Sequence, residues 1–98
     1  MRKNVNGKCF DTETATKIIH THYGYVGEIL YYDDTLYKTN DGEYFLHRSR
    51  FVFPVPIQSF TRETVRAEII PMTLDEAQNW CRKYFGDYVC DDIFETVA

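Results

Sequence analysis

Long hydrophobic runs are missing from this 98-residue sequence. No window approaches the roughly 18 apolar residues of a membrane-spanning helix, and the first ten residues, MRKNVNGKCF, lack the apolar segment of a signal peptide. Cysteine is also scarce. Cys9, Cys81 and Cys90 are an odd number at irregular spacing, so they predict no disulfide framework. These absences predict a cytoplasmic protein that does not enter a membrane.

Motifs of known metal sites are missing as well. The sequence has no CxxC and no HExxH, and no second close histidine pair accompanies His20 and His22. On a strand these two rings would share one face, and Cys9 or Asp11 could add a further zinc ligand. Two ligands do not make a site, so we expect exposed strand histidines, no metal and no cofactor.

The remaining reactive residues predict no catalysis. Cys81 falls on an apolar helical stripe, where a buried and inert thiol is expected. General acid-base catalysis needs carboxyl groups that converge in space. The neighbouring acids at 33–34 predict a solvated turn instead, and those at 91–92 predict a solvated helix face. The chain is therefore not expected to be an enzyme.

Aromatic residues are what the chain has in quantity, with eight Tyr, seven Phe and one Trp. Each such ring can bury a large area, so a short chain can still build a core. Hydrophobic residues make up 44% and charged residues 27%, which is the composition of a folded chain and not of a disordered one. We expect a single domain over residues 1–98, mostly β in 1–70 and helical in 71–98.

Turn signals and alternating residues predict the strands. The dipeptide NG at residues 6–7 is the strongest signal for a two-residue hairpin turn. TLYKTNDGEYFLH, residues 35–47, places alternating runs on both sides of a second turn. Three further segments are considered as strands: residues 15–23, residues 28–32 and residues 64–70.

Some of these segments leave alternatives open. In residues 15–23, alternation puts the odd-numbered residues from Lys17 to Tyr23 on one face, and a short helix beginning at Thr12 or Thr14 is the alternative. The strand at 28–32 is expected to break at the two aspartates that follow it. Residues 48–61 contain two prolines, so they predict an extended edge or a loop.

The period changes after Pro71. Thr73 and Glu76 form a capping box, and an apolar stripe follows at helical spacing; it comprises Leu74, Ala77, Trp80, Cys81 and Tyr84. Gly86 is a helix stop, and Asp87 can cap a second short helix with either Tyr88 and Val89 or Ile93 and Phe94 pointing inward. The fold class is therefore α+β: an antiparallel sheet of about five strands followed by one or two C-terminal helices packed on it.

Charge is distributed unevenly along the chain. Residues 47–66 carry four arginines against one glutamate, whereas residues 67–98 carry seven acidic residues against two basic ones. A basic middle followed by an acidic end predicts charged surfaces that recognise a partner.

Three stretches carry a family resemblance: GKCFDTETAT at 7–16, DTLYKTNDGEYFLH at 34–47, and IIPMTLDEAQNW at 69–80 with the acidic end DYVCDDIFE. In the order of these phrases, over about half its length, the chain resembles a small, poorly characterised protein family of Gram-positive bacteria, their phages and mobile elements. The family often continues past the hairpin with a glycine-rich stretch, where this chain has RSRFVFPVPIQSF. That departure points to residues 48–62 as specific to this protein.

The leading hypothesis is a non-enzymatic inhibitor that binds a host protein or ribonucleoprotein complex. Phage proteins of this size and class include CRISPR inhibitors, so a CRISPR effector or another nucleic-acid-handling complex is the expected target. The expected contacts are the basic segment and the acidic end, comprising Arg48, Arg50, Phe51, Phe53, Arg62 and Arg66 with Asp87, Asp91 and Asp92.

Two alternatives belong to other classes. A nucleic-acid-binding accessory domain could stack bases on tyrosines beside the same arginines. The acidic pI of about 5.2 makes direct nucleic-acid binding the less favoured of the two binding hypotheses. A small metal-dependent enzyme would use His20 and His22.

Overall fold

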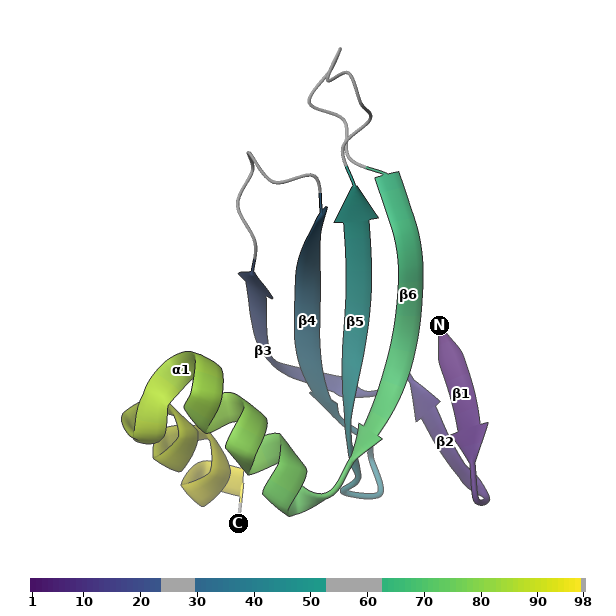
Figure 1. Ribbon diagram of the computed structural model, residues 1–98. Coiled ribbons are helices and arrows are strands. Elements are labelled where there is room, and N and C mark those ends of the chain that lie inside the picture. Colours follow the sequence, from purple (N-terminus) through teal and green to yellow (C-terminus); the bar gives the residue numbers. More distant parts are fainter. Residues whose placement is uncertain (24–29, 53–62, 98) are drawn as a thin grey trace.

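The computed structural model describes residues 1–23, 30–52 and 63–97, and it confirms the α+β class (Figure 1). Within these residues six strands form two antiparallel sheets, where one sheet of about five strands was expected, and one helix follows them. The elements are β1 (Arg2–Val5), β2 (Lys8–Asp11), β3 (Thr16–Tyr23), β4 (Leu30–Lys38), β5 (Tyr44–Val52), β6 (Glu63–Met72) and α1 (Leu74–Val97). β1 and β2 pair with each other, and the larger sheet has the order β3-β4-β5-β6.

The hairpin of β1 and β2 turns at the predicted dipeptide. Asn6 has φ 51° and Gly7 has φ 77°, so both central residues occupy the left-handed region that a tight hairpin turn requires. Asparagine and glycine are the residues that tolerate this region best. The turn brings Val5 opposite Lys8.

β3 is a strand and not the alternative short helix. One part of its prediction is wrong, because a register shift between Lys17 and Ile19 reverses the alternation. Lys17 pairs with Tyr37, whereas Ile19 pairs with Leu36. Neighbouring residues of β4 point to opposite faces, so Lys17 lies on the face opposite to Ile19.

β4 runs without interruption through the two aspartates, so the predicted break and solvated turn are wrong. Asp34 is completely buried, and Arg48 donates two hydrogen bonds to it from β5. Asp33 points to the other face, where its Oδ1 lies 2.9 Å from Nε2 of His20. Each carboxylate thus has a cross-strand partner, which lets an acidic pair lie within a strand.

The second hairpin is confirmed, and β5 extends it. The Thr39 backbone N–H donates to the Glu43 carbonyl oxygen at 2.8 Å and closes the turn. Gly42 within the turn has φ 85°. β5 continues to Val52 as a central strand, which corrects the expectation of an edge or loop for residues 48–52; residues 53–61 of that prediction lie outside the described residues. Pro71 lies near the end of β6, an edge strand that tolerates the missing N–H.

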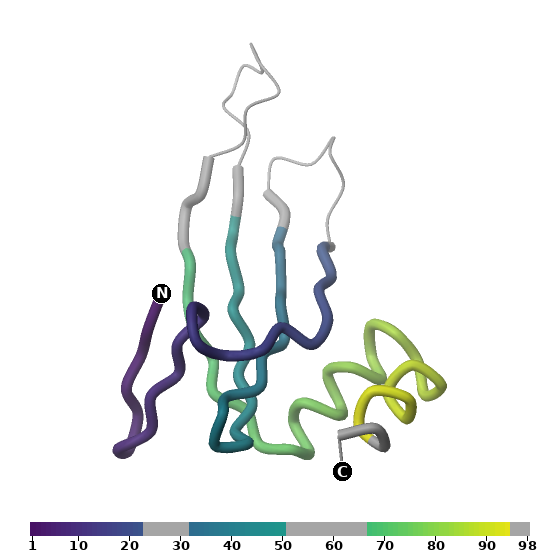
Figure 2. The backbone as a smooth tube through the Cα atoms, turned by 180° about the vertical axis from the view of Figure 1, so that it is seen from behind, coloured from purple at the N-terminus to yellow at the C-terminus, as the bar shows by residue number. Residues whose placement is uncertain are grey.

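The larger sheet is covered on both faces near the turn that joins β4 to β5. On one face α1 packs against Leu36, Tyr44 and Leu46 (Figure 1). On the other face Phe10 of β2 packs against Tyr37 and Phe45, and the connection from β2 to β3 crosses this side (Figure 2). The two apolar clusters fix the sheet between the helix and the small hairpin.

The helix begins at the predicted capping box. Thr73 N–H donates to Glu76 Oε1 at 3.0 Å, and Glu76 N–H donates to Thr73 Oγ1 at 3.1 Å. Ala77, Trp80 and Cys81 of the predicted stripe are buried. Leu74, the first residue of that stripe, is 50% exposed and lies outside the buried core.

Gly86 divides the helix, as the predicted stop required. Its φ of 86° and ψ of 171° are not helical, and α1 kinks there before it continues. Beyond the kink Phe94 is buried, whereas the Tyr88 side chain is 88% exposed. The inward-pointing set is therefore the one with Ile93 and Phe94.

Candidate functional site

The predicted basic contacts divide into residues with different structural roles. Arg48 Nε donates to Asp34 Oδ1 at 2.9 Å and Arg48 Nη2 donates to Asp34 Oδ2 at 3.0 Å. Only 25% of the Arg48 side chain is exposed. Arg48 therefore neutralises a buried carboxylate within the sheet.

Arg50 is the next residue of β5 on the same face of the sheet as Arg48. Its guanidinium carbon is 5.2 Å from the centre of the Tyr32 ring, a cation–π contact between β5 and β4. Its Nε is buried and has no hydrogen-bond partner in the part of the chain that the structure describes. The register places Arg66 of β6 opposite Arg50. The strands thus bring two of the four predicted arginines into neighbouring positions.

The other predicted basic-segment residues are placed only in part. Phe51 belongs to β5, opposite Thr64 of β6. Phe53 and Arg62 lie outside the described residues.

The predicted acidic contacts gather on the second half of α1. Asp87, Asp91 and Asp92 are all exposed, and Tyr88 stands among them with 88% of its side chain in solvent. Residues four apart are neighbours on a helix surface, so Asp87 lies beside Asp91 and Tyr88 lies beside Asp92. We call these four residues the acidic helix surface. Arg82 Nε lies 3.7 Å from Asp87 Oδ1, a long and exposed ion pair that neutralises little.

The histidine pair lies on one face of β3, as the strand geometry predicted. The ring centres of His20 and His22 are 6.4 Å apart, and Asp33 lies directly opposite His22. Cys9 belongs to the separate β1–β2 sheet. Among the described residues, no three His, Cys, Asp or Glu side chains are placed to hold a metal ion together.

The two helical cysteines are buried on either side of the kink. Burial, with Cys90 next to it, raises the pKa of the Cys81 thiol to about 11. Cys90 Sγ donates to the carbonyl oxygen of Gln78 at 3.6 Å, which ties the second half of α1 to the first. Since the thiolate is the nucleophilic form, this environment suits packing and not catalysis.

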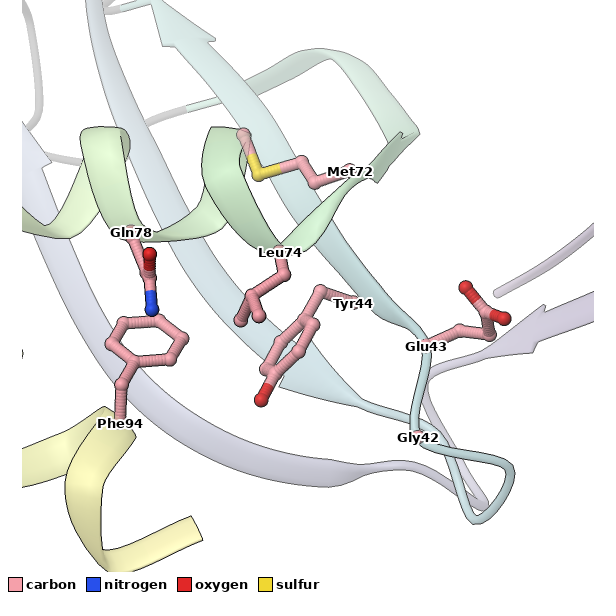
Figure 3. A pocket seen from close by; sticks show the side chains of 7 residues that line it. All are labelled: Gly42, Glu43, Tyr44, Met72, Leu74, Gln78 and Phe94. Carbon is pink, nitrogen blue, oxygen red and sulfur yellow. The ribbon is translucent and has the colours of Figure 1, made fainter. Parts of the chain in front are cut away.

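A pocket that the sequence did not reveal lies between the end of the sheet and the helix (Figure 3). Its volume is about 380 Å³, and its lining comes from Gly42, Glu43, Tyr44, Met72, Leu74, Gln78 and Phe94. We call it the Tyr44–Phe94 pocket. A smaller hollow of about 220 Å³ on the side of the β1–β2 hairpin shares Glu43 and Met72 with it. No motif marks the pocket, because its walls come from three separate segments.

Comparison of the chain with models of known protein families, with curated proteins and with solved structures finds no match. The family resemblance, and the partner that it implies, remain predictions. No helix in the described ranges is long and apolar enough to cross a membrane.

Proposed function

We propose that the chain is a non-enzymatic protein-binding inhibitor from a phage or mobile element, and that it blocks a nucleic-acid-handling complex of the host, such as a CRISPR effector. The observation that carries the proposal is the acidic helix surface. Tyr88 is 88% exposed, so an unusually large aromatic surface lies in solvent for so small a protein. Three exposed aspartates surround it. Exposed aromatic residues of this kind are frequent anchors of protein interfaces.

The charge of this surface defines the kind of partner. Residues 87–92 of α1 carry three carboxylates and no basic residue. A groove that normally holds nucleic acid is lined by Lys and Arg, and carboxylates on a rigid helix can pair with the same cations. Binding would then exclude the nucleic acid from its groove. Electrostatic steering would speed association at low salt and weaken as salt rises.

Affinity capture with matched variants tests the proposal. The tagged chain serves as bait in lysate of a Gram-positive host, at low and at moderate salt, and mass spectrometry identifies what is retained. We expect one stoichiometric partner, which moderate salt releases. Tyr88→Ala should weaken its binding about 30-fold, as truncation of an anchor worth about 2 kcal/mol does. Asp91→Lys should abolish retention.

Glu13→Lys is the matched control, because it makes the same change of charge at an exposed residue away from α1. The partner should be retained by this variant. Equal retention by the wild type, Tyr88→Ala and Asp91→Lys would exclude the acidic helix surface as the contact.

The cation–π contact of Arg50 with Tyr32 favours a second candidate function, that of a nucleic-acid-binding accessory domain. Arginine and aromatic side chains together can bind phosphate and stack bases. A gel shift with single-stranded DNA and RNA at low salt separates the two functions. A shift that Arg50→Ala removes supports the second candidate, and no shift at high protein concentration excludes it.

A further inference from the structure

Cys81 and Cys90 lie on different halves of α1, which meet because of the kink at Gly86. The two cysteines are nine positions apart in the sequence. In a straight helix this spacing would put them on opposite sides and about 13 Å apart along the axis. Here the second half of α1 turns back and runs beside the first half (Figure 1, Figure 2). The conformation of Gly86 therefore determines whether the two cysteines can meet.

The thiols of the two cysteines are in contact. Cys90 Sγ donates to the carbonyl oxygen of Gln78 at 3.6 Å, and Gln78 lies in the helical turn over which the Cys81 side chain leans. Burial raises the pKa of Cys81, and so do the charge of Cys90 and a hydrogen bond between the two thiol groups. Both residues belong to one apolar cluster with Ala77 and Phe94. Sulfur atoms in this arrangement need only a small approach to reach bonding distance.

The third cysteine is kept apart from this pair. Cys9 is exposed on β2, and β2 packs on the face of the larger sheet opposite to α1. Cys81 and Cys90 are 0% and 1% exposed, so neither is open to a second copy of the chain while the fold is closed. Within the folded chain these two thiols can therefore pair only with each other.

We propose that Cys81 and Cys90 form a reversible disulfide bond when the ratio of disulfide to thiol around the protein rises, and that this bond locks the kink of α1. The oxidant is a low-molecular-weight disulfide. The thiolate of one cysteine attacks the oxidant, which releases one thiol and leaves a mixed disulfide; the other cysteine then displaces the second thiol. One S–S bond breaks and one forms, and the protein passes two electrons and two protons to the oxidant.

Burial makes the first attack slow. A thiolate is scarce in the apolar cluster, and the oxidant reaches a sulfur atom only when the second half of α1 opens away from the first. Closure then brings the other thiol next to the mixed disulfide. The bond itself does not depend on the function proposed above. One consequence rests on that function: the second half of α1 carries the acidic helix surface, so oxidation would hold this surface in a fixed position.

Equilibrium oxidation of the full-length Cys9→Ser chain tests the proposal, with mixtures of reduced and oxidised glutathione as the probe. Equilibrium is approached from the reduced chain and from the oxidised chain. Trypsin cleaves after Arg82 and Lys83, between the two cysteines, so the disulfide joins peptides 67–82 and 84–98. We expect mass spectrometry to find this linked pair in a monomeric chain. Oxidation should raise the urea midpoint of unfolding by about 1 M.

Two comparisons show whether the fold brings the thiols together. In the native chain, half-oxidation should require a ratio of oxidised glutathione to squared reduced glutathione about a hundredfold smaller than in the chain unfolded by urea. Gly86→Ala disfavours the kink, so this variant should need a ratio about tenfold larger than the parent chain. Asn79→Ala is the matched control at an exposed position of the same helix, and it should leave the ratio unchanged.

Three results would overturn the proposal. A native chain that stays reduced at ratios that oxidise the unfolded chain would show that the fold holds the thiols apart. Equal ratios for the native and the unfolded chain would show that the fold contributes nothing to the bond. An unchanged ratio in Gly86→Ala would separate the bond from the kink. A failure of the acidic helix surface would appear instead in the capture experiment with Tyr88→Ala, so the two proposals fail independently.

Discussion

Arg48 and Asp34 form a two-pronged ion pair across β5 and β4, with N···O distances of 2.9 and 3.0 Å, and Asp34 has no exposed surface. A buried carboxylate is tolerated only when a cation and hydrogen bonds compensate it. Removal of one partner leaves the other charged and desolvated. The pair therefore ties the central strands of the sheet together.

Arg48→Ala should lower the free energy of unfolding by about 3–5 kcal/mol, the usual cost of breaking a buried ion pair. Urea denaturation followed by circular dichroism measures this loss. Arg82→Ala is the control, because Arg82 makes only a long, exposed contact with Asp87, and it should cost less than about 1 kcal/mol. A loss below about 1 kcal/mol for Arg48→Ala as well would contradict the role given to the pair.

This pair also bears on the choice of variants for partner binding. A chain in which all the predicted arginines are replaced at once would lose stability through Arg48, so lost binding could not be assigned to a contact. Arg50→Ala is the informative substitution, since the Arg50 side chain stacks on Tyr32, whereas Asp34, the buried acid among the described residues, is held by Arg48. It should preserve most of the stability measured for the wild type.

Short-range signals in the sequence predicted their structures well. The turn at residues 6–7 and the capping box of Thr73 and Glu76 formed as expected, because each depends only on residues within a few positions of one another. Gly86 interrupts α1 for the same kind of reason. Local conformational preference was enough in these places.

Features that depend on distant residues were not predictable. Two adjacent aspartates are typical of a turn, and only Arg48 on the next strand lets Asp34 lie inside β4. The register shift after Lys17 has no sequence signature. The Tyr44–Phe94 pocket needs a hairpin, the first turn of α1 and the last turns of α1 in one place. Residue spacing in the sequence does not predict that these separate segments lie together in the fold.

The stability of the fold should depend on pH through His47. Burial, with the positive charges of the amino terminus and Lys17, lowers the pKa of His47, and Asp34 opposes this only in part. In the unfolded chain His47 gains a proton near pH 6.5, the ordinary pKa of histidine. In the folded chain His47 gains its proton only at a lower pH. The stabilisation is therefore present above about pH 6.5 and is lost as the pH falls below it.

His47→Gln should flatten this dependence. Urea denaturation at several pH values between about pH 7.5 and about pH 5 should show a smaller fall in the free energy of unfolding for this variant than for the wild type. His22→Gln serves as the control because His22 is exposed on the same sheet. If the two variants lose stability along the same curve as the wild type, His47 does not carry the effect.

The cysteines should differ sharply in reactivity. Cys9 is exposed, whereas Cys81 and Cys90 are buried, and the pKa of Cys81 is raised to about 11. At about pH 8 only about one Cys81 thiol in a thousand is ionised. A chromogenic disulfide reagent should label one thiol of the native chain rapidly and all three after denaturation. Cys9→Ser should abolish the rapid phase, and a rapid phase that persists would show that a helical cysteine reacts.

Gly86 should be required for the kink of α1. Its φ of 86° and ψ of 171° belong to a region that residues with a side chain almost never occupy. A Cβ atom at this position would meet no atom within 4 Å, so any cost of substitution is conformational and not steric. Gly86→Ala should lower the free energy of unfolding by about 1–3 kcal/mol in urea denaturation.

The stereochemistry of the residue at position 86 separates this explanation from a loss of packing. D-Alanine favours positive φ, so a chain assembled by chemical ligation at Cys81 with D-alanine at this position should keep the stability of the wild type. Asn79→Ala, at an exposed helical position, should be neutral or slightly stabilising. Equal destabilisation by L- and D-alanine would mean that the kink depends on something other than the sign of φ. Because the kink turns Phe94 back towards Tyr44, Gly86→Ala should also displace the amide signals of residues that line the pocket.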